Sequence, residues 1–239
     1  MFKPTIVWDE NQTPISTHFD DVYFNTEGAI DETRYVFIEG NDLYQRFSKH
    51  DQEIFIVGET GFGSGLSFLI LWQTFFHFRK QHPDHILKKL KFFSVEKFPL
   101  SSEELLQIHH KVLMNDEGLQ TLASLLETSL NKGESLCQFE NITLTIFCDD
   151  ISNFPDFLRK QNVLIHAWFF DGFSPAKNPD MWSESLFNEC FTLTAPNGTF
   201  ATFTAAGFVR RNLLNAGFNV FKRKGFGIKR EMLIGKKPV

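Results

Sequence analysis

The sequence EIFIVGETGFGSGL, which runs from Glu53 to Leu66, carries the strongest structural signal in the chain. An apolar run of strand length ends in the acid Glu59 and three closely spaced glycines, and a helix-permissive segment follows over residues 66–80. Glycines at such a junction let the backbone approach a ligand closely, because they have no Cβ and tolerate positive φ. This order predicts a strand, a loop and a helix that hold a nucleotide-like cofactor at the carboxyl end of a parallel sheet.

Three interpretations of the glycine loop compete. A dinucleotide site favours G-x-G-x-x-G with an acid about 20 residues later, whereas this chain has G-x-G-x-G and its next strand-end acid is Glu96. The carboxylate of Glu59 would also repel a pyrophosphate in a partly desolvated cleft. S-adenosyl-L-methionine (SAM) has no phosphate and carries a cationic sulfonium and an ammonium, so it suits an acid beside the loop better. The third interpretation is a glycine turn used only for tight packing.

Apolar runs of strand length alternate with helix-permissive segments along most of the chain, which predicts a mostly parallel sheet covered on both faces. The last stretch predicts an antiparallel hairpin around residues 225–227. This Rossmann-like plan is usual for SAM-dependent methyltransferases. Residues 1–50 do not follow the alternation, and we expect them to form an amino-terminal extension packed on a methyltransferase domain of residues 51–239. The expected strands are 54–58, 91–95, 142–148, 163–170, 199–204, 218–222 and 229–234, and the expected helices are 66–80, 101–114, 117–130, 151–160, 181–193 and 208–216.

The composition is that of a soluble globular protein, with 239 residues of which 42% are hydrophobic and 22% charged. No apolar run reaches the roughly 18 residues that a membrane span requires, and residues 1–10 lack the layout of a secretory signal. The three cysteines, Cys137, Cys148 and Cys190, form neither a disulfide framework nor a metal-binding pattern. We therefore expect a cytoplasmic protein with reduced thiols, no metal and no membrane partner.

The charge distribution is asymmetric although the net charge is only −5. Residues 209–239 contain nine basic residues and one acidic residue, so this segment carries +8 and residues 1–208 carry −13. Such polarity indicates either a solvated basic tail or a surface for a polyanion, of which nucleic acid is the commonest.

Acids follow two further expected strands. Glu96 can accept hydrogen bonds from both ribose hydroxyls of an adenosine cofactor, or it can be a surface acid paired with Lys97. One of Asp149 and Asp150 can accept from the adenine amine, and either can cap the helix that follows. These positions predict the nucleoside half of a SAM site.

The string AWFFDGFSPAKNP, residues 167–179, brings an acid from an apolar strand into a loop marked by glycine and proline. Methyl transfer to an amine requires a neutral amine aimed at the methyl carbon. A carboxylate at Asp171 can orient that amine and stabilise the cation that forms, and Phe173 can stack on a flat substrate such as an extruded base. The alternative is a polar turn in which Asp171 caps the helix near Trp182 and Phe173 lies in the core.

Several strings resemble the methyltransferase domain of the MnmC family. The resemblance covers nearly the whole chain and is weakest over residues 101–145. The strings are FDDVYF (19–24), ETRYVF (32–37), ETGFGSGL (59–66), SVEKFPL (94–100), AWF to PDMW (167–182), ATFT to RR (201–211) and KRKGFG to M (222–232).

This resemblance implies a SAM-dependent enzyme that methylates the amine of 5-aminomethyl-2-thiouridine at the tRNA wobble position, giving 5-methylaminomethyl-2-thiouridine. It implies Asp171 as the active-site acid. At Asp149 a glycine is more usual in the family, so the choice between Asp149 and Asp150 stays open. The implied cofactor-binding residues are Glu59, Gly61, Phe62, Gly63, Gly65, Glu96, Lys97 and Asp150.

Bifunctional members of the family continue into an FAD-dependent oxidase that generates the amine, so such a domain is an expected partner in cis or in trans; no flavin is expected in this chain. The expected RNA partner is the tRNA anticodon loop, whose unpaired bases can be splayed out while phosphate contacts position the loop. Two other interpretations stay open, a methyltransferase for another RNA base or amine and a catalytically silent RNA-binding module. The expected substrate-binding residues are Phe173, Lys177, Arg210, Arg211, Lys222, Arg223, Lys224, Lys229 and Arg230.

Overall fold

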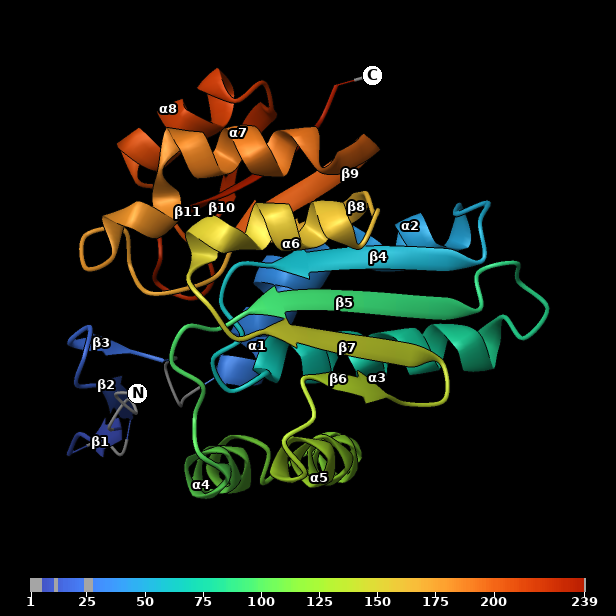
Figure 1. Cartoon of the computed structure of the whole chain (residues 1–239), viewed down its shortest axis with the longest axis vertical. Helices are drawn as coiled ribbons and strands as arrows, with labels where there is room; N and C mark the ends of the chain where they lie inside the picture. Colours follow the sequence, from blue (N-terminus) through green and yellow to red (C-terminus); the bar gives the residue numbers. More distant parts are fainter. Residues whose placement is uncertain (1–5, 11–12, 24–27, 239) are drawn as a thin grey trace.

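A computed structural model describes residues 6–10, 13–23 and 28–238. Its centre is an eight-stranded sheet of order β10-β11-β9-β8-β4-β5-β7-β6 (Figure 1). The five strands from β9 to β7 in this order are parallel, and β6, β11 and β10 join antiparallel. This confirms the predicted Rossmann-like fold and its carboxyl-terminal hairpin. The strands are β4 (Ile54–Glu59), β5 (Lys89–Val95), β6 (Leu136–Gln138), β7 (Ile142–Phe147), β8 (Ile165–Phe169), β9 (Thr194–Thr202), β10 (Asn219–Lys224) and β11 (Glu231–Lys236).

Helices cover both faces of the sheet (Figure 1). One face packs against α1 (Ala29–Thr33), the π-helix η1 (Arg34–Glu39), α2 (Leu43–Ser48) and α3 (Leu66–Gln81). The opposite face packs against α6 (Phe154–Lys160), α7 (Glu184–Thr192) and α8 (Gly207–Asn215), with the short helices η2 (Ile151–Asn153) and η3 (Pro179–Trp182) preceding α6 and α7. The remaining helices, α4 (Ser102–Val112) and α5 (Glu117–Asn131), follow β5 and lie beside α3 and the β6 edge of the sheet.

Strand side chains alternate between the two faces, and this alternation divides the core. On β5, Phe92 is buried with the α3 layer, whereas Phe93 is buried with the α6–α8 layer. Trp168 of β8 is fully buried on the second side and lies against Gly58 of β4. A Cβ at Gly58 would stand 2.6 Å from the Trp168 ring, so only glycine permits this contact.

Three expected elements differ clearly from the structure. The expected helix 181–193 is divided into η3 and α7, because Ser183 caps α7 by accepting from the amide of Leu186. The expected helix 151–160 is divided into η2 and α6, because Asp150 caps η2 and Pro155 stands in the first turn of α6. Strand β9 starts earlier than expected, at Thr194, and its pairing with β8 shifts register between Ile165 and Ala167.

The amino-terminal segment has two parts. Strands β1 (Ile6–Trp8), β2 (Pro14–Ser16) and β3 (Asp21–Val22) form a separate antiparallel sheet beside the carboxyl ends of β4, β5 and β7 (Figure 1). Residues 29–48 instead belong to a helical layer of the domain; there Arg46 donates a 2.8 Å hydrogen bond to the carbonyl of His166. Of the expected extension, residues 1–5, 11–12 and 24–27 lie outside the described part of the chain.

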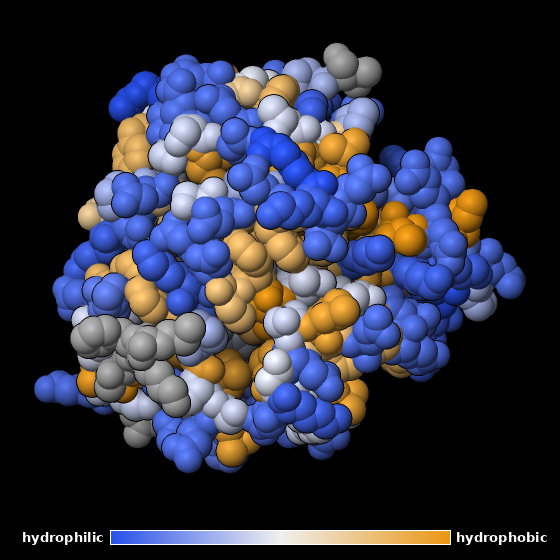
Figure 2. All heavy atoms as spheres, in the orientation of Figure 1, coloured by the Kyte–Doolittle hydropathy of each residue, from blue (hydrophilic) through white to orange (hydrophobic). Residues whose placement is uncertain are grey.

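The face of the molecule in Figure 2 is mostly hydrophilic, with apolar side chains in small groups. In the described part of the chain, no helix combines the length and apolar character that crossing a membrane requires. All three cysteines are free thiols, of which Cys137 and Cys190 are buried and Cys148 is exposed.

Candidate active site

Two cavities meet at the carboxyl ends of the central strands. From β4 the sheet extends through β5 in one direction and through β8 in the other, so the loops after these strands diverge and leave a crevice. The first cavity is lined by the glycine loop after β4 and by the loops after β5, β7 and β8. The second lies between α1, the loop after β9 and the β10–β11 turn, and it is the larger, about 880 Å³ against about 210 Å³.

The glycine loop adopts a conformation that requires its glycines. Gly63 and Gly65 have φ angles of +52° and +74°, and Gly65 immediately precedes α3. A Cβ at Gly61 would lie 3.3 Å from the backbone oxygen of Asp171, so glycine lets the two loops touch. Gly61, Phe62 and Gly63 line the first cavity, whereas Gly65 lies behind it.

Glu96 joins the loop after β5 to the glycine loop. Its Oε2 accepts a hydrogen bond from the amide of Gly63 and its Oε1 accepts one from the amide of Phe98, both at 2.9 Å. Burial raises the pKa of Glu96, and these backbone donors oppose the shift. The carboxylate lines the first cavity and is not paired with Lys97, so the alternative interpretation of Glu96 as a surface acid paired with Lys97 is wrong.

Lys97 pairs instead with Asp150, at 2.7 Å, and this contact lowers the pKa of Asp150 to about 2. Asp150 also caps η2, because its Oδ1 accepts from the amide of Ser152 at 3.0 Å. Asp149 accepts from the amide of Asp150 at 2.7 Å. Both aspartates line the cavity, so capping and a cofactor contact are compatible, and the residue that contacts the adenine stays a prediction.

Glu59 lies beneath the glycine loop and not in the lining of either cavity. Its carboxyl group is fully buried and accepts hydrogen bonds from the hydroxyls of Ser67 on α3 and Ser94 on β5, the latter at 2.7 Å. Burial, with the nearby Asp171 in second place, raises the pKa of Glu59 well above its usual value. The structure therefore gives Glu59 a bracing position, and the acids facing the first cavity are Glu96, Asp149, Asp150, Asp171 and Asp180.

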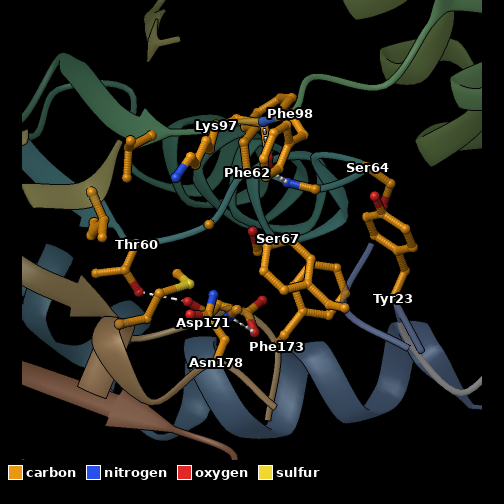
Figure 3. Close-up of a pocket in the computed structure, with 18 of the residues that line it drawn as sticks. Tyr23, Thr60, Phe62, Ser64, Ser67, Lys97, Phe98, Asp171, Phe173 and Asn178 are labelled. Carbon is orange, nitrogen blue, oxygen red and sulfur yellow. Dashed lines mark hydrogen bonds between the residues drawn. The ribbon is translucent and has the colours of Figure 1, made fainter. Parts of the chain in front are cut away.

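Asp171 stands where the two cavities join and lines both. Its Oδ1 accepts from the amide of Gly172 at 2.8 Å, and its backbone oxygen accepts from the hydroxyl of Thr60 at 2.6 Å. The pKa of Asp171 is raised to about 7, chiefly by burial and also by the charge of Glu32, whereas the hydrogen bond from Gly172 and the charge of Lys229 oppose the rise. In Figure 3 Asp171 lies across the cavity from Lys97 and Phe62. A half-buried carboxyl group that titrates near neutrality suits proton transfer.

The small β1–β3 sheet covers the first cavity. The rings of Phe19 and Phe173 stack with centroids 4.4 Å apart, and Tyr23 meets Phe173 edge-on at 5.3 Å (Figure 3 shows Tyr23 and Phe173). Asp21 accepts from the amide of Ser174 at 2.7 Å. Sequence reasoning missed Phe19 and Tyr23 as site residues, although both belong to the string FDDVYF that carried part of the family resemblance.

The expected substrate-binding cations are not all brought together. Lys229 and Arg230 line the second cavity, whereas the others lie outside the linings of both. Ion pairs join Lys222 to Glu231, Arg223 to Glu39 and Lys229 to Glu32. Lys177 binds Asp20 and so ties the loop after β8 to the amino-terminal sheet. No ion pair within the described ranges involves Lys224, Arg230, Arg210 or Arg211.

Comparisons with known proteins agree with this architecture. A family model described as S-adenosyl-L-methionine-dependent methyltransferase matches residues 115–238. The chain is 46% identical over 238 residues to the tRNA 5-methylaminomethyl-2-thiouridine biosynthesis bifunctional protein MnmC of Actinobacillus pleuropneumoniae serotype 5b (strain L20), which covers 98% of this chain and 35% of that protein. The MnmC protein of Aliivibrio fischeri is 46% identical over 230 residues, covering 95% of this chain and 34% of that protein.

The chain thus spans about a third of the length of these relatives. Among solved structures, the crystal structure of MNMC2 from Aquifex aeolicus has a similar fold, with a TM-score of 0.70 and 22% sequence identity. That similarity covers 100% of this chain and 72% of the other.

Proposed function

Since this chain belongs to the family of S-adenosyl-L-methionine-dependent methyltransferases, we propose that it methylates the primary amine of 5-aminomethyl-2-thiouridine at the wobble position of tRNA. The product would be 5-methylaminomethyl-2-thiouridine, which the names of its relatives contain. The observation that carries the proposal is the position of Asp171, which lines both the first cavity and the larger second cavity. A substrate amine held beside Asp171 would face the methyl donor.

The charge of the first cavity suits SAM. Five acids line it among the described residues, and its single lining cation, Lys97, is paired with Asp150. Such a lining favours a cationic ligand and disfavours a phosphate. When bound, SAM supplies an electrophilic methyl group on its sulfonium. Glu96 would hold the ribose hydroxyls, Gly61 and Gly63 would let the backbone approach the ligand, and Asp149 or Asp150 would accept from the adenine amine.

In the proposed reaction, Asp171 handles the proton of the acceptor. The amine enters as an ammonium, and the Asp171 carboxylate accepts one proton and orients the lone pair that remains. The neutral amine would attack the methyl carbon that bound SAM supplies; the N–C bond would form as the C–S bond breaks, and the electron pair of that bond would stay on sulfur. The product is a secondary ammonium, which carries the charge that sulfur loses. The proton on Asp171 then passes to solvent.

The proposal also covers the source of the amine and the compartment in which the enzyme acts. The relatives are named bifunctional, and we infer that an FAD-dependent oxidase part, in cis or in trans, supplies the amine. Action on tRNA would place the enzyme in the cytoplasm.

The direct test is incubation of the protein with methyl-labelled SAM and tRNA from cells that lack this methylation. Label at the wobble uridine, identified after nuclease digestion, is the expected result. Label at another nucleotide would assign the enzyme a different RNA substrate. SAM binding without transfer to any nucleotide of this tRNA would refute the proposal.

The unpaired cations near the second cavity should contribute most to tRNA affinity. Replacing both Lys224 and Arg230 with alanine is expected to weaken tRNA binding about 10-fold and to reduce the slope of log K against log salt by about 1 to 2, because each phosphate contact releases counterions. The matched control is Lys222→Ala, since Lys222 is already paired with Glu231 at 2.7 Å. Fluorescence anisotropy across a salt series measures both quantities. Equal effects of the control and the double variant would contradict this surface.

A further inference from the structure

An ion pair in the second cavity is not explained by the methyl-transfer chemistry described so far. Glu32 extends from α1 into the cavity and its side chain is 19% exposed. The ammonium of Lys229 lies 2.6 Å from its Oε1 and 5.4 Å from the ring centre of Phe203. Lys229 itself is half exposed and belongs to the turn between β10 and β11. The mostly buried carboxylate of Glu32 is therefore paired with the long side chain of Lys229, which lies at the rim of the second cavity.

Three other acids of this cavity are held by backbone amides: Asp9 accepts from Thr13, Asp21 from Ser174 and Asp171 from Gly172. The fourth, Glu231, pairs with the half-exposed side chain of Lys222. Among the described residues, the carboxylate of Glu32 contacts only the side chain of Lys229. It differs from Glu231 in being more buried, with 19% of the side chain exposed against 33%. It is also close enough to Asp171 for its charge to act on that residue. Glu32 thus places a negative charge beside the reacting centre, and another cation can replace Lys229 as its counter-ion.

Building on the proposed function, we propose that Glu32 is the specificity residue that recognises the cationic arm of the acceptor nucleotide. The entering ammonium replaces Lys229 as the partner of Glu32, and the released Lys229 turns to an RNA phosphate. Each charge keeps a counter-charge during this exchange, so no carboxylate is left buried and unpaired, a state that would be strongly unfavourable. Lys229 has Arg230 as its neighbour and Lys224 at the other end of the same turn, so its new partner would join an existing cationic surface.

The pair of Glu32 and Lys229 would also disfavour nucleotides that carry a different arm at the wobble uridine. An uncharged arm could not replace Lys229, and an arm ending in a carboxylate would meet the negative charges of Glu32 and Asp171. Glu32 would therefore select for the free amine over precursors in which the nitrogen carries an acidic substituent.

The test compares the binding of tRNAs that differ only in the arm at the wobble uridine: aminomethyl, hydroxymethyl and carboxymethylaminomethyl. Binding is measured with S-adenosylhomocysteine present, so that no turnover occurs. Wild-type protein is expected to prefer the aminomethyl tRNA by about 10-fold or more, the usual range for a partly buried charge-assisted contact. Glu32→Gln should lose this preference, and in turnover it should raise KM for the aminomethyl tRNA more than it lowers kcat.

Glu39→Gln is the matched control, because Glu39 pairs with Arg223 in a similar way, at 2.9 Å, but lines neither cavity. It should retain the arm preference. Lys229→Met should lower the salt slope by about 1 for the aminomethyl tRNA only, because only that arm releases Lys229 to a phosphate. It should leave the salt slopes of the other two tRNAs unchanged and retain the arm preference, since Glu32 is still present. A Glu32→Gln protein that still distinguishes the arms, or a Lys229→Met protein that no longer does, would overturn the exchange. The two proposals can be distinguished. If the wild type transfers methyl groups but Glu32→Gln still discriminates between the arms, only the role of Glu32 is rejected. If the wild type transfers no methyl group, both proposals are rejected.

Discussion

Replacement of Asp171 with asparagine is expected to slow methyl transfer by about 10²- to 10⁴-fold, the range for loss of a positioned proton acceptor. Asparagine keeps the shape of the side chain and can still accept from the amide of Gly172. It cannot accept a proton from the substrate ammonium. Single-turnover transfer from labelled SAM to aminomethyl tRNA measures the loss, and Asp156→Asn on the surface of α6 serves as the control.

The same variant should be more stable than the wild type in mild alkali. The pKa of Asp171 is raised to about 7 in the folded protein, so the folded state favours the neutral carboxyl group. Its stabilising contribution is complete below the unfolded pKa of about 4 and is lost as pH rises through about 7. An asparagine side chain cannot ionise, so at pH 8 the Asp171→Asn variant should gain about 2–4 kcal/mol in free energy of unfolding relative to the wild type.

Urea unfolding at pH 5 and pH 8 measures this difference, and kcat/KM of the wild type should rise through about pH 7 as Asp171 ionises. A variant that is both more stable and inactive would separate catalysis from folding. An active Asp171→Asn enzyme, or an inactive one that unfolds more easily at pH 8, would contradict the role proposed for this carboxylate.

Replacement of Glu96 with alanine should weaken SAM binding by about 100-fold. Two effects act together: the ribose hydroxyls lose a charged acceptor, which contributes about 1.5–3 kcal/mol per hydrogen bond, and the amides of Gly63 and Phe98 lose their partner. Isothermal titration with SAM measures the change. The rise in Tm that saturating SAM gives the wild type should also become small, because the stabilisation that a ligand gives grows with its concentration relative to Kd.

Glu103→Ala, an exposed acid on α4, is the control for Glu96→Ala. It should bind SAM as the wild type does. If Glu96→Ala retains wild-type affinity, the ribose of the cofactor lies elsewhere in the cavity.

The sheet and the glycine loop could be predicted because their signals are local. The apolar run before Gly58 and the glycines at 61, 63 and 65 specify a strand and a turn without reference to the rest of the chain. The direction of a side chain at a strand end is not local. The buried position of Glu59 depends on hydroxyls from Ser67 and Ser94, so the sequence alone did not show that Glu59 braces α3 and β5. Its contact with the cofactor stays a prediction.

The second cavity could not be predicted for a related reason. Glu32 and Lys229 are 197 residues apart in the sequence and meet only because α1 lies beside the turn between β10 and β11. The short strands β1 to β3 were missed as well, because runs of two or three residues carry no measurable periodicity. The basic segment was recognised as a whole, but its division into paired and unpaired cations depends in part on Glu32 and Glu39, which are distant in the sequence.

The segment around β3 forms part of the wall of both cavities, since Val22 and Tyr23 line each of them. A ligand in either cavity therefore restricts the same stretch of backbone. Whichever ligand binds first would meet the entropic cost of fixing that stretch, and the second would bind to a wall already ordered. We therefore expect SAM and RNA to affect each other's binding through this shared wall, even if the two ligands do not touch.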